Sequence, residues 1–168
     1  MRYLVFYGAG IGDFISLLPM AQQIKKNDKN ATIVCFNVSD KNKIKINKEM
    51  LSVQDYIDEI DYYSAHELIH SVLFIVRYIF KKFDYAIIVQ HEDNDSASLW
   101  PYYICKTVSK KVAGYELKNR KQVKYDITIP RKGNQLFVDI YMKICEEIGC
   151  KSDHIDFPLL NIDDIKVD

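Results

Sequence analysis

The sequence has no excess of charge of either sign. Its 168 residues include 23 Lys and Arg and 23 Asp and Glu, so the formal net charge is zero. Proteins that bind nucleic acid usually carry a clear basic excess, because neutralising the phosphates supplies most of their affinity. The overall charge therefore argues against a nucleic-acid partner, although it leaves a local basic site open.

The sequence also lacks cysteines at the paired spacing of a metal site. The four cysteines are Cys35, Cys105, Cys145 and Cys150. Two of them sit in apolar runs, and the other two flank the end of a helical pattern. We therefore expect buried, reduced thiols and no metal bound by them.

Long apolar stretches are missing as well. The most apolar segment, 68–80, is too short to cross a bilayer and includes His70 and Arg77. Near the N-terminus, Asp13 interrupts a stretch that otherwise looks like a signal peptide. We therefore expect a cytoplasmic protein, and a peripheral contact with the inner face of the membrane stays open.

What the sequence does contain is an alternation of strand and helix patterns. Strands are expected at 3–7, 31–37, 57–63, 85–90 and 112–115, and helices at 67–83, 96–109 (broken by Pro101) and 135–148. A further helix follows the first strand, and Pro19 inside its apolar pattern means that it either begins near Ser16 or is kinked. Strands that alternate with helices predict a mostly parallel sheet covered on both faces, an α/β Rossmann-like fold in three layers.

Length and composition favour one globular domain. The chain is 48% hydrophobic and 27% charged, which is typical of a protein with a single core. Its polarity rises after Gly149. We expect 1–150 to form the domain, and 151–168 to be a linker or tail towards a missing second domain.

A glycine-rich turn separates the first strand from the first helix. The turn reads Gly8-Ala-Gly-Ile-Gly12 and is followed by Asp13. Backbone N–H groups at the start of a helix attract anions, and ligands of open α/β sheets gather at the carboxyl ends of the strands. The segment 8–13 is therefore the best-placed candidate site in the sequence.

One interpretation of this turn is a dinucleotide-binding fingerprint. Gly8 and Gly10 match the first two glycines of G-x-G-x-x-G, but Asp13 occupies the third position, where its carboxylate would repel a pyrophosphate. A dinucleotide fingerprint also has an acidic residue at the end of the second strand to bind the ribose, and Asn37 is found there instead. An NAD(P)- or nucleotide-binding Rossmann enzyme stays an open alternative, as does a truncated, non-catalytic interaction domain.

The same turn belongs to a second pattern. Gly12 and Asp13 are followed by Pro19, six residues after the Asp. Three later stretches continue the pattern: 53–60, 83–90 and 112–115. In these features the sequence resembles the ADP-heptose:lipopolysaccharide heptosyltransferases, glycosyltransferase family nine. The resemblance covers nearly the whole chain, but only the N-terminal half of such an enzyme.

The sequence departs from the family pattern at two positions. Tyr7 stands where the family usually has a basic residue, and His91 follows Gln90 where a glycine is usual. The resemblance implies the N-terminal half of a GT-B glycosyltransferase in lipopolysaccharide biosynthesis. Such an enzyme transfers a sugar from a nucleotide-sugar co-substrate to a cell-envelope glycan or glycolipid, with inversion and without a metal or other cofactor. The donor would bind a second domain that is missing from this sequence, and activity would require that domain.

The chemistry assigns a role to each candidate residue. Asp13 would be the catalytic base, because the attacking sugar hydroxyl must lose a proton. The resemblance also implies that Gln90 contacts the acceptor, while the turn residues Gly10, Ile11 and Gly12 would bind the acceptor or a phosphate. A purely structural role for Asp13, as the N-cap of the first helix, stays open.

A local basic segment adds one further candidate. Between 106 and 132 there are nine Lys and Arg against Glu116 and Asp126. Such a segment suits an anionic acceptor or an anionic membrane face, and a soluble surface with scattered lysines is the alternative. Arg120 is the residue expected to grip an anion, because its planar guanidinium binds oxyanions through two hydrogen bonds.

Overall fold

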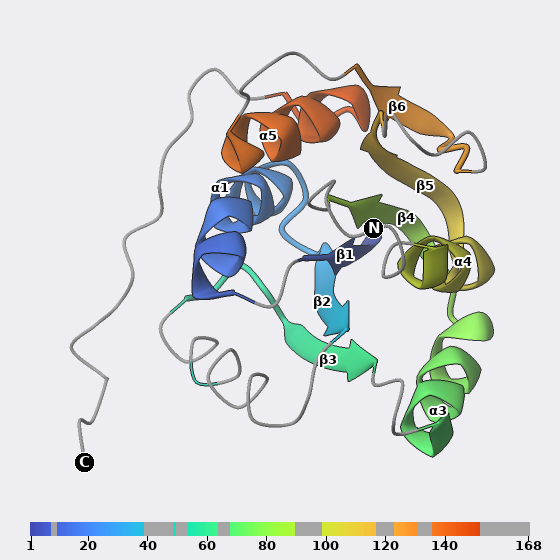
Figure 1. Cartoon of the computed structure of the whole chain (residues 1–168). Coiled ribbons are helices and arrows are strands. Elements are labelled where there is room, and N and C mark those ends of the chain that lie inside the picture. Colours follow the sequence, from blue (N-terminus) through green and yellow to red (C-terminus); the bar gives the residue numbers. More distant parts are fainter. Residues whose placement is uncertain are drawn as a thin grey trace.

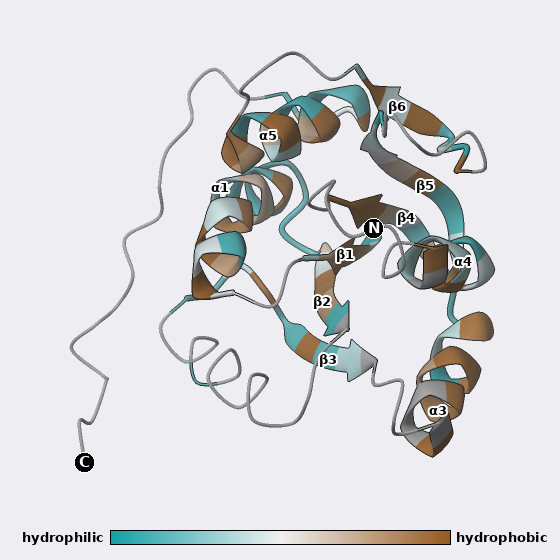
Figure 2. Cartoon of the chain, viewed as in Figure 1, coloured by the Kyte–Doolittle hydropathy of each residue, from teal (hydrophilic) through white to brown (hydrophobic). Residues whose placement is uncertain are grey.

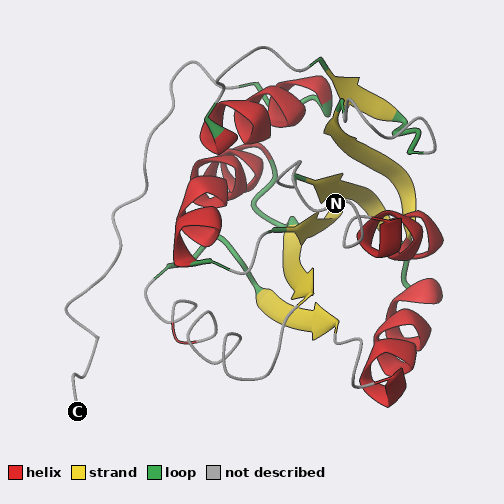
Figure 3. Cartoon of the chain, in the orientation of Figure 1, coloured by secondary structure: helices red, strands yellow, loops and turns green. Residues whose placement is uncertain are grey.

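The computed structural model describes residues 1–7, 10–38, 49, 54–63, 68–89, 99–116, 123–130 and 136–151. The strands are β1 (Arg2–Phe6), β2 (Thr32–Val38), β3 (Glu59–Tyr63), β4 (Phe83–Ile88), β5 (Ser109–Tyr115) and β6 (Ile127–Ile129). The helices are α1 (Ile11–Asn27), α3 (Leu68–Ile79), α4 (Leu99–Val108) and α5 (Phe137–Glu147). Helices and strands alternate along most of the chain, so the predicted α/β class is confirmed (Figure 3).

All six strands form one parallel sheet in the order β3-β2-β1-β4-β5-β6. Phe6 at the end of β1 lies opposite Phe36 of β2 on one side and Ile88 of β4 on the other. The carboxyl ends of the strands therefore meet at one edge. β2 and β3 are added on one side of β1, and β4, β5 and β6 on the other side. The point where the strand order reverses therefore lies between β1 and β4. In folds of this kind, ligands bind at that point.

Two helical layers cover the two faces of the sheet (Figure 1). Side chains alternate along β1, because successive residues of a strand point to opposite faces. Tyr3 and Val5 join the core beneath α1 and α5, whereas Leu4 and Phe6 join the core beneath α3 and α4. The predicted three-layer arrangement is therefore confirmed.

Of the two arrangements predicted for the first helix, a start near Ser16 is wrong, and a kink at Pro19 stays a prediction. α1 starts at Ile11, not near Ser16, and runs through Pro19 to Asn27. Proline removes one backbone hydrogen bond from a helix interior. The Pro19 side chain is buried, so packing against the core offsets part of that loss. In α4, Pro101 lies in the first turn, where the missing N–H costs little, so it does not break the helix.

The strand β6 was missed by the sequence analysis. It has three residues, and one of them, Thr128, is exposed. Backbone hydrogen bonds hold it in place: the N–H of Glu116 donates to the carbonyl of Ile129, and that of Asp126 to the carbonyl of Val112. So short a strand has no periodicity to detect, and its place in the sheet depends on β5.

The glycine of β5 is needed for close packing. A Cβ atom at Gly114 would lie 2.6 Å from the ring of Tyr125, closer than any ordinary contact. The Tyr125 ring packs edge-on against Tyr102 of α4, with 5.8 Å between ring centroids. Only a residue without a side chain lets β5 pass beneath this ring.

The four cysteines are buried and form no disulfide, as expected. Burial raises the pKa of Cys35 and that of Cys105, which keeps both thiols protonated. None of the helices in the described ranges has the length and apolar character needed to cross a bilayer. Of the predicted tail 151–168, only Lys151 lies within the described residues, so that boundary stays a prediction.

Two carboxylates stabilise the strand ends on the edge opposite the glycine turn. Asp84 accepts hydrogen bonds from the backbone N–H of Arg2 at 2.9 Å and from Nζ of Lys110 at 2.7 Å. The bond from Lys110 is the main reason that the pKa of Asp84 is lowered. Asp126 accepts from the backbone N–H of Val112 at 2.8 Å, which lowers its pKa in the same way.

These lowered pKa values predict a loss of stability in acid. A carboxyl whose pKa is lower in the folded state stabilises the fold above its unfolded pKa, near 4, and loses that effect as the pH falls through the folded value. The thermal unfolding midpoint should therefore drop steadily below about pH 4. The double variant D84N/D126N should show a flatter drop over the same range. If both proteins lose stability in parallel, these two carboxylates are not the cause.

Candidate functional site

The glycine turn places the start of α1 at the carboxyl edge of the sheet. β1 ends at Phe6, and α1 begins only five residues later at Ile11. Gly10 is the N-cap residue, with an extended backbone (φ −91°, ψ 152°). Gly8 and Ala9 lie outside the described residues. The positive end of the α1 dipole therefore lies beside the point where the strand order reverses, which is a suitable place for an anionic ligand.

Asp13 is the third residue of α1 and is partly exposed. One of its oxygens, Oδ2, accepts a hydrogen bond from the backbone N–H of Gly10 at 3.3 Å. The N-cap is thus Gly10 rather than Asp13, and Asp13 reaches back to it as an acidic residue of a capping box does. A distance of 3.3 Å is long for an N–H···O hydrogen bond, so this particular bond is weak.

The two described glycines of the turn differ in their surroundings. A Cβ at Gly10 would lie 3.3 Å from Oδ2 of Asp13, so a larger residue there would push against the carboxylate. Apart from its chain neighbours and the backbone of α1, no described residue lies within 4 Å of a Cβ at Gly12. Ile11, between them, is 44% exposed. Among the described residues, the space around Gly12, next to the carboxylate, is therefore open.

Buried aromatic residues hold this turn from behind. Tyr7, directly after β1, and Phe14, directly after Asp13, are both fully buried and pack edge-on, with 5.7 Å between ring centroids. Tyr141 of α5 is buried nearby. Burial raises its pKa, and the negative charge of Asp13 contributes to the rise. Asp13 thus lies close enough to this buried tyrosine to act on it electrostatically.

The position of Tyr141 near Asp13 was not predicted from the sequence. Tyr7 had been noted only as a departure from the family pattern. Tyr7 is a core residue that anchors α1. Tyr141 lies far along the chain from Asp13, and only the packing of α5 against α1 brings the two together. No local pattern in the sequence could have indicated that contact.

Asn37 is a buried polar residue near the same edge. It is the second-last residue of β2, it is 0% exposed, and it lies on the face covered by α1 and α5. Neither atom of its side-chain amide has a hydrogen-bond partner in the described part of the chain. Such a group destabilises a fold by about 1–3 kcal/mol. Because Asn37 is fully buried, it is not positioned to hold a ribose as the acidic residue of a dinucleotide site does.

Two predicted site residues, Gln90 and Arg120, lie outside the described residues. The structure thus brings Gly10, Ile11, Gly12 and Asp13 together and leaves those two as predictions. The basic segment is described only in part. Its members Lys106 and Lys110 form ion pairs with Asp126 (3.1 Å) and Asp84 (2.7 Å). Lys110 lies at the start of β5, on the edge opposite Asp13.

Comparisons with known proteins support the fold through structure rather than sequence. No protein-family model matches the sequence, and no curated protein matches it. The structure is similar to Escherichia coli ADP-heptose lps heptosyltransferase II, with a TM-score of 0.68 and 15% identity, over 95% of this chain and 46% of that chain. E. coli heptosyltransferase WaaC with ADP gives a TM-score of 0.66 and 12% identity, over 94% and 50% of the two chains.

A third similar structure is the glycosyl transferase family 9 protein from Veillonella parvula, with a TM-score of 0.59 and 15% identity, over 89% of this chain and 41% of that chain. The chain therefore spans about half the length of the solved structures that it matches. At such low identity the likeness establishes the fold. The chain has the α/β fold of about half of a GT-B heptosyltransferase, and the resemblance predicted from the sequence is confirmed at that level.

Proposed function

We propose that this chain is the acceptor-binding half of an inverting, heptosyltransferase-like glycosyltransferase, with Asp13 as its catalytic base. One observation carries the proposal. The carboxylate of Asp13 lies in the first turn of α1, partly exposed, next to Gly12, above which no described residue packs, and it accepts a hydrogen bond of 3.3 Å from the Gly10 N–H. The turn lies at the carboxyl edge of the sheet, where ligands of this fold class bind.

The geometry suits proton removal during sugar transfer. The acceptor hydroxyl gives its proton to Asp13 while its oxygen forms a bond to the anomeric carbon of the donor sugar. The bond from that carbon to the nucleoside diphosphate breaks on the opposite side, so the configuration is inverted. The positive end of α1 favours the negative charge that develops on the departing phosphate. The reaction calls for no metal or other cofactor.

The partners follow from the same proposal. E. coli heptosyltransferase WaaC, which has this fold, has been solved with ADP and with ADP-2-deoxy-2-fluoro heptose. We take the donor to be a nucleotide-sugar bound by a second domain that activity requires. The acceptor is a cell-envelope glycan or glycolipid, with Gln90 and Arg120 as its further contacts. The proposal places the reaction in the cytoplasm, at the inner face of the membrane.

Two features weigh against a dinucleotide-binding enzyme. Asp13 places a negative charge in the first turn of α1, where a pyrophosphate would sit. β2 contains no acidic residue, and Asn37 near its end is fully buried. Both features disfavour the binding of NAD, and neither disfavours the binding of a sugar acceptor.

Acceptor binding tests the proposal without a donor domain. Titration calorimetry of this chain with deacylated lipopolysaccharide core is expected to show binding that G12A weakens about tenfold or more, because the added methyl group fills space next to Asp13 that the acceptor would use. The methyl group of G12A meets no described residue within 4 Å beyond its chain neighbours and the backbone of α1, so the variant should be as stable as the original chain or slightly more so.

The same titration with NAD is the control. Tight NAD binding that G12A abolishes would support the dinucleotide interpretation and contradict the proposal. A folded chain that binds neither deacylated core nor nucleotide-sugar would identify a non-catalytic interaction domain.

A further inference from the structure

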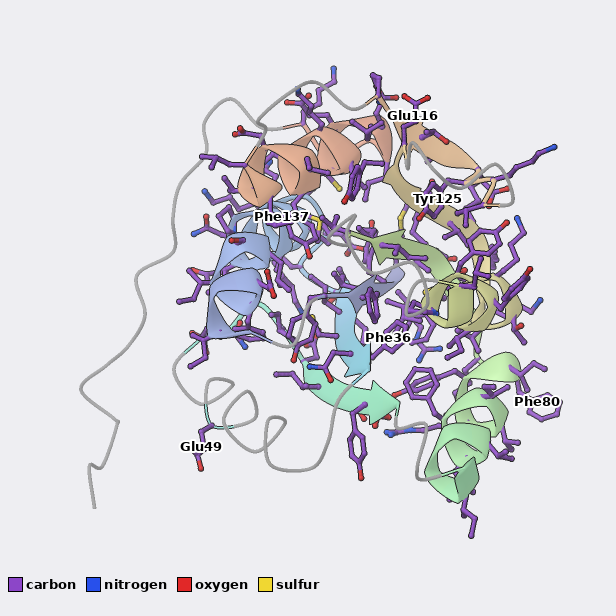
Figure 4. All side chains as sticks on the ribbon, viewed as in Figure 1. Phe36, Glu49, Phe80, Glu116, Tyr125 and Phe137 are labelled. Atoms are coloured by element: carbon purple, nitrogen blue, oxygen red, sulfur yellow. The ribbon has the colours of Figure 1, made fainter. Side chains whose placement is uncertain are left out.

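The outer side of α3 exposes a continuous apolar surface. Six large apolar side chains at helical spacing along α3 and its exit are exposed: Ile69, Val72, Leu73, Val76, Ile79 and Phe80. We call these residues the outer face of α3. Phe80 is 88% exposed, and Figure 4 shows its ring pointing away from the molecule. Single exposed apolar residues are ordinary, but six in one stripe mark a surface that another body covers.

The inner side of the same helix is also apolar. Phe74 and Tyr78 are buried against the sheet beneath α3. The helix is therefore hydrophobic on both sides, as its colouring in Figure 2 shows. A helix of this kind is normally buried or lies against lipid. α3 has 12 residues, about 18 Å, so it is too short to span the roughly 30 Å core of a bilayer.

The helical layer that carries this face has positive charge and no negative charge. Within the described residues 68–82 and 99–108, the charged residues are Arg77, Lys81, Lys82 and Lys106, and there is no Asp or Glu. Arg77 and Lys106 form ion pairs with carboxylates of neighbouring strands. Lys81 and Lys82, directly after Phe80, are exposed and form no ion pair with any residue that the structure describes.

The opposite layer has a different composition. α1 and α5 contain Asp13, Asp139, Glu146 and Glu147 together with Lys25, Lys26 and Lys143. Among the described residues, positive charge lies next to an exposed apolar face only on the α3 and α4 side.

We propose that the outer face of α3, with Lys81 and Lys82, docks the protein onto an anionic lipid bilayer. The apolar side chains would enter the boundary between headgroups and acyl chains, with α3 lying in the membrane plane, and the lysines would contact the negative headgroups. The charges distinguish this occupant from a second copy of the chain. A two-fold symmetric contact through this face would bring the cations of both copies together, which is unfavourable.

This inference does not rest on the proposed function, because binding to lipid requires neither an acceptor nor a donor. Vesicle co-sedimentation of the chain tests it. We expect binding to vesicles of phosphatidylcholine with about one third phosphatidylglycerol, little binding to pure phosphatidylcholine, and weaker binding as salt is raised.

Two double variants separate the apolar and charged parts of the surface. I69S/F80S should lower the partition coefficient onto anionic vesicles by about tenfold or more. K81Q/K82Q should lower it about 30-fold, because each lysine near an anionic surface contributes roughly one kcal/mol. All four side chains are exposed, so neither variant should disturb the core.

Matched controls lie on the other layer. L136S removes an apolar side chain that is 67% exposed beside α5, and K29Q/K151Q removes two exposed lysines after α1 and α5. Both should bind like the original chain. Absence of binding to anionic vesicles would overturn the proposal. A dimer in sedimentation velocity that I69S/F80S dissociates, without vesicle binding, would assign the face to a second copy instead.

Discussion

Replacing Asp13 with Asn should lower the rate of sugar transfer by about 10²–10⁴-fold, the usual contribution of a general base. The variant D13N keeps the size of the side chain and an oxygen that can accept from the Gly10 N–H. The turn should therefore keep its shape, and acceptor binding should stay within a few-fold of the original value. A loss in turnover without a loss in binding indicates a group that acts only in the transition state.

The measurement is transfer of labelled heptose from ADP-heptose to deacylated lipopolysaccharide core, with the donor-binding domain that the proposal requires. A matched control exists within the chain. Asp139 is the third residue of α5, after the N-cap Leu136, just as Asp13 is the third residue of α1 after Gly10. D139N and D13N remove the same kind of favourable interaction with a helix dipole, about 0.3–1 kcal/mol of stability each. If D13N transfers sugar as fast as D139N, Asp13 has only a structural role.

Replacing Phe14 with Ala should destabilise the fold by about 3–5 kcal/mol, which is a large share of the stability of an ordinary domain. Phe14 is fully buried between α1 and the sheet and packs against Tyr7. The substitution removes apolar area from the core and leaves a cavity beside the ring of Tyr7, one residue along the chain from Asp13. We therefore expect a lower urea midpoint and, in the folded fraction, weaker acceptor binding.

Phe80 supplies the control for this second prediction. F80A removes the same atoms from a side chain that is 88% exposed, so its effect on the free energy of unfolding should be within about 0.5 kcal/mol of zero. Urea unfolding of F14A and F80A, side by side, isolates the contribution of burial. Equal midpoints would show that Phe14 is not part of a packed core.

The parts of the fold that were predicted correctly have strong local signals. β1, β2 and β4 are apolar runs of five to seven residues, and the structure has each of them within two residues of its predicted position. The start of α1 was left open between Ser16 and a longer helix kinked at Pro19, because proline is unfavourable in a helix interior; the helix in fact begins at Ile11, with the Pro19 side chain buried. β6 was missed because three residues are too few to show a period.

The candidate site was predicted only in its local part. The positions of Gly10, Gly12 and Asp13 follow from the chain itself, since a turn between a strand and a helix joins neighbouring residues. The order of the six strands does not follow from the chain, because it depends on which apolar faces pack together. The same is true of the buried position of Tyr7 and of the approach of Tyr141 to Asp13.

The alternation of strands and helices and the carboxylate after the glycine turn could be predicted from the chain, because periodicity and turn chemistry depend on residues that are close in sequence. Long-range packing, in contrast, places this carboxylate, partly exposed, above buried tyrosines at the edge where the strand order reverses. It also decided which side of α3 is left without a protein partner in the described residues. The physical reason is the same in both cases: a side chain is buried or exposed according to what packs against it, and most of those partners lie far away in the sequence.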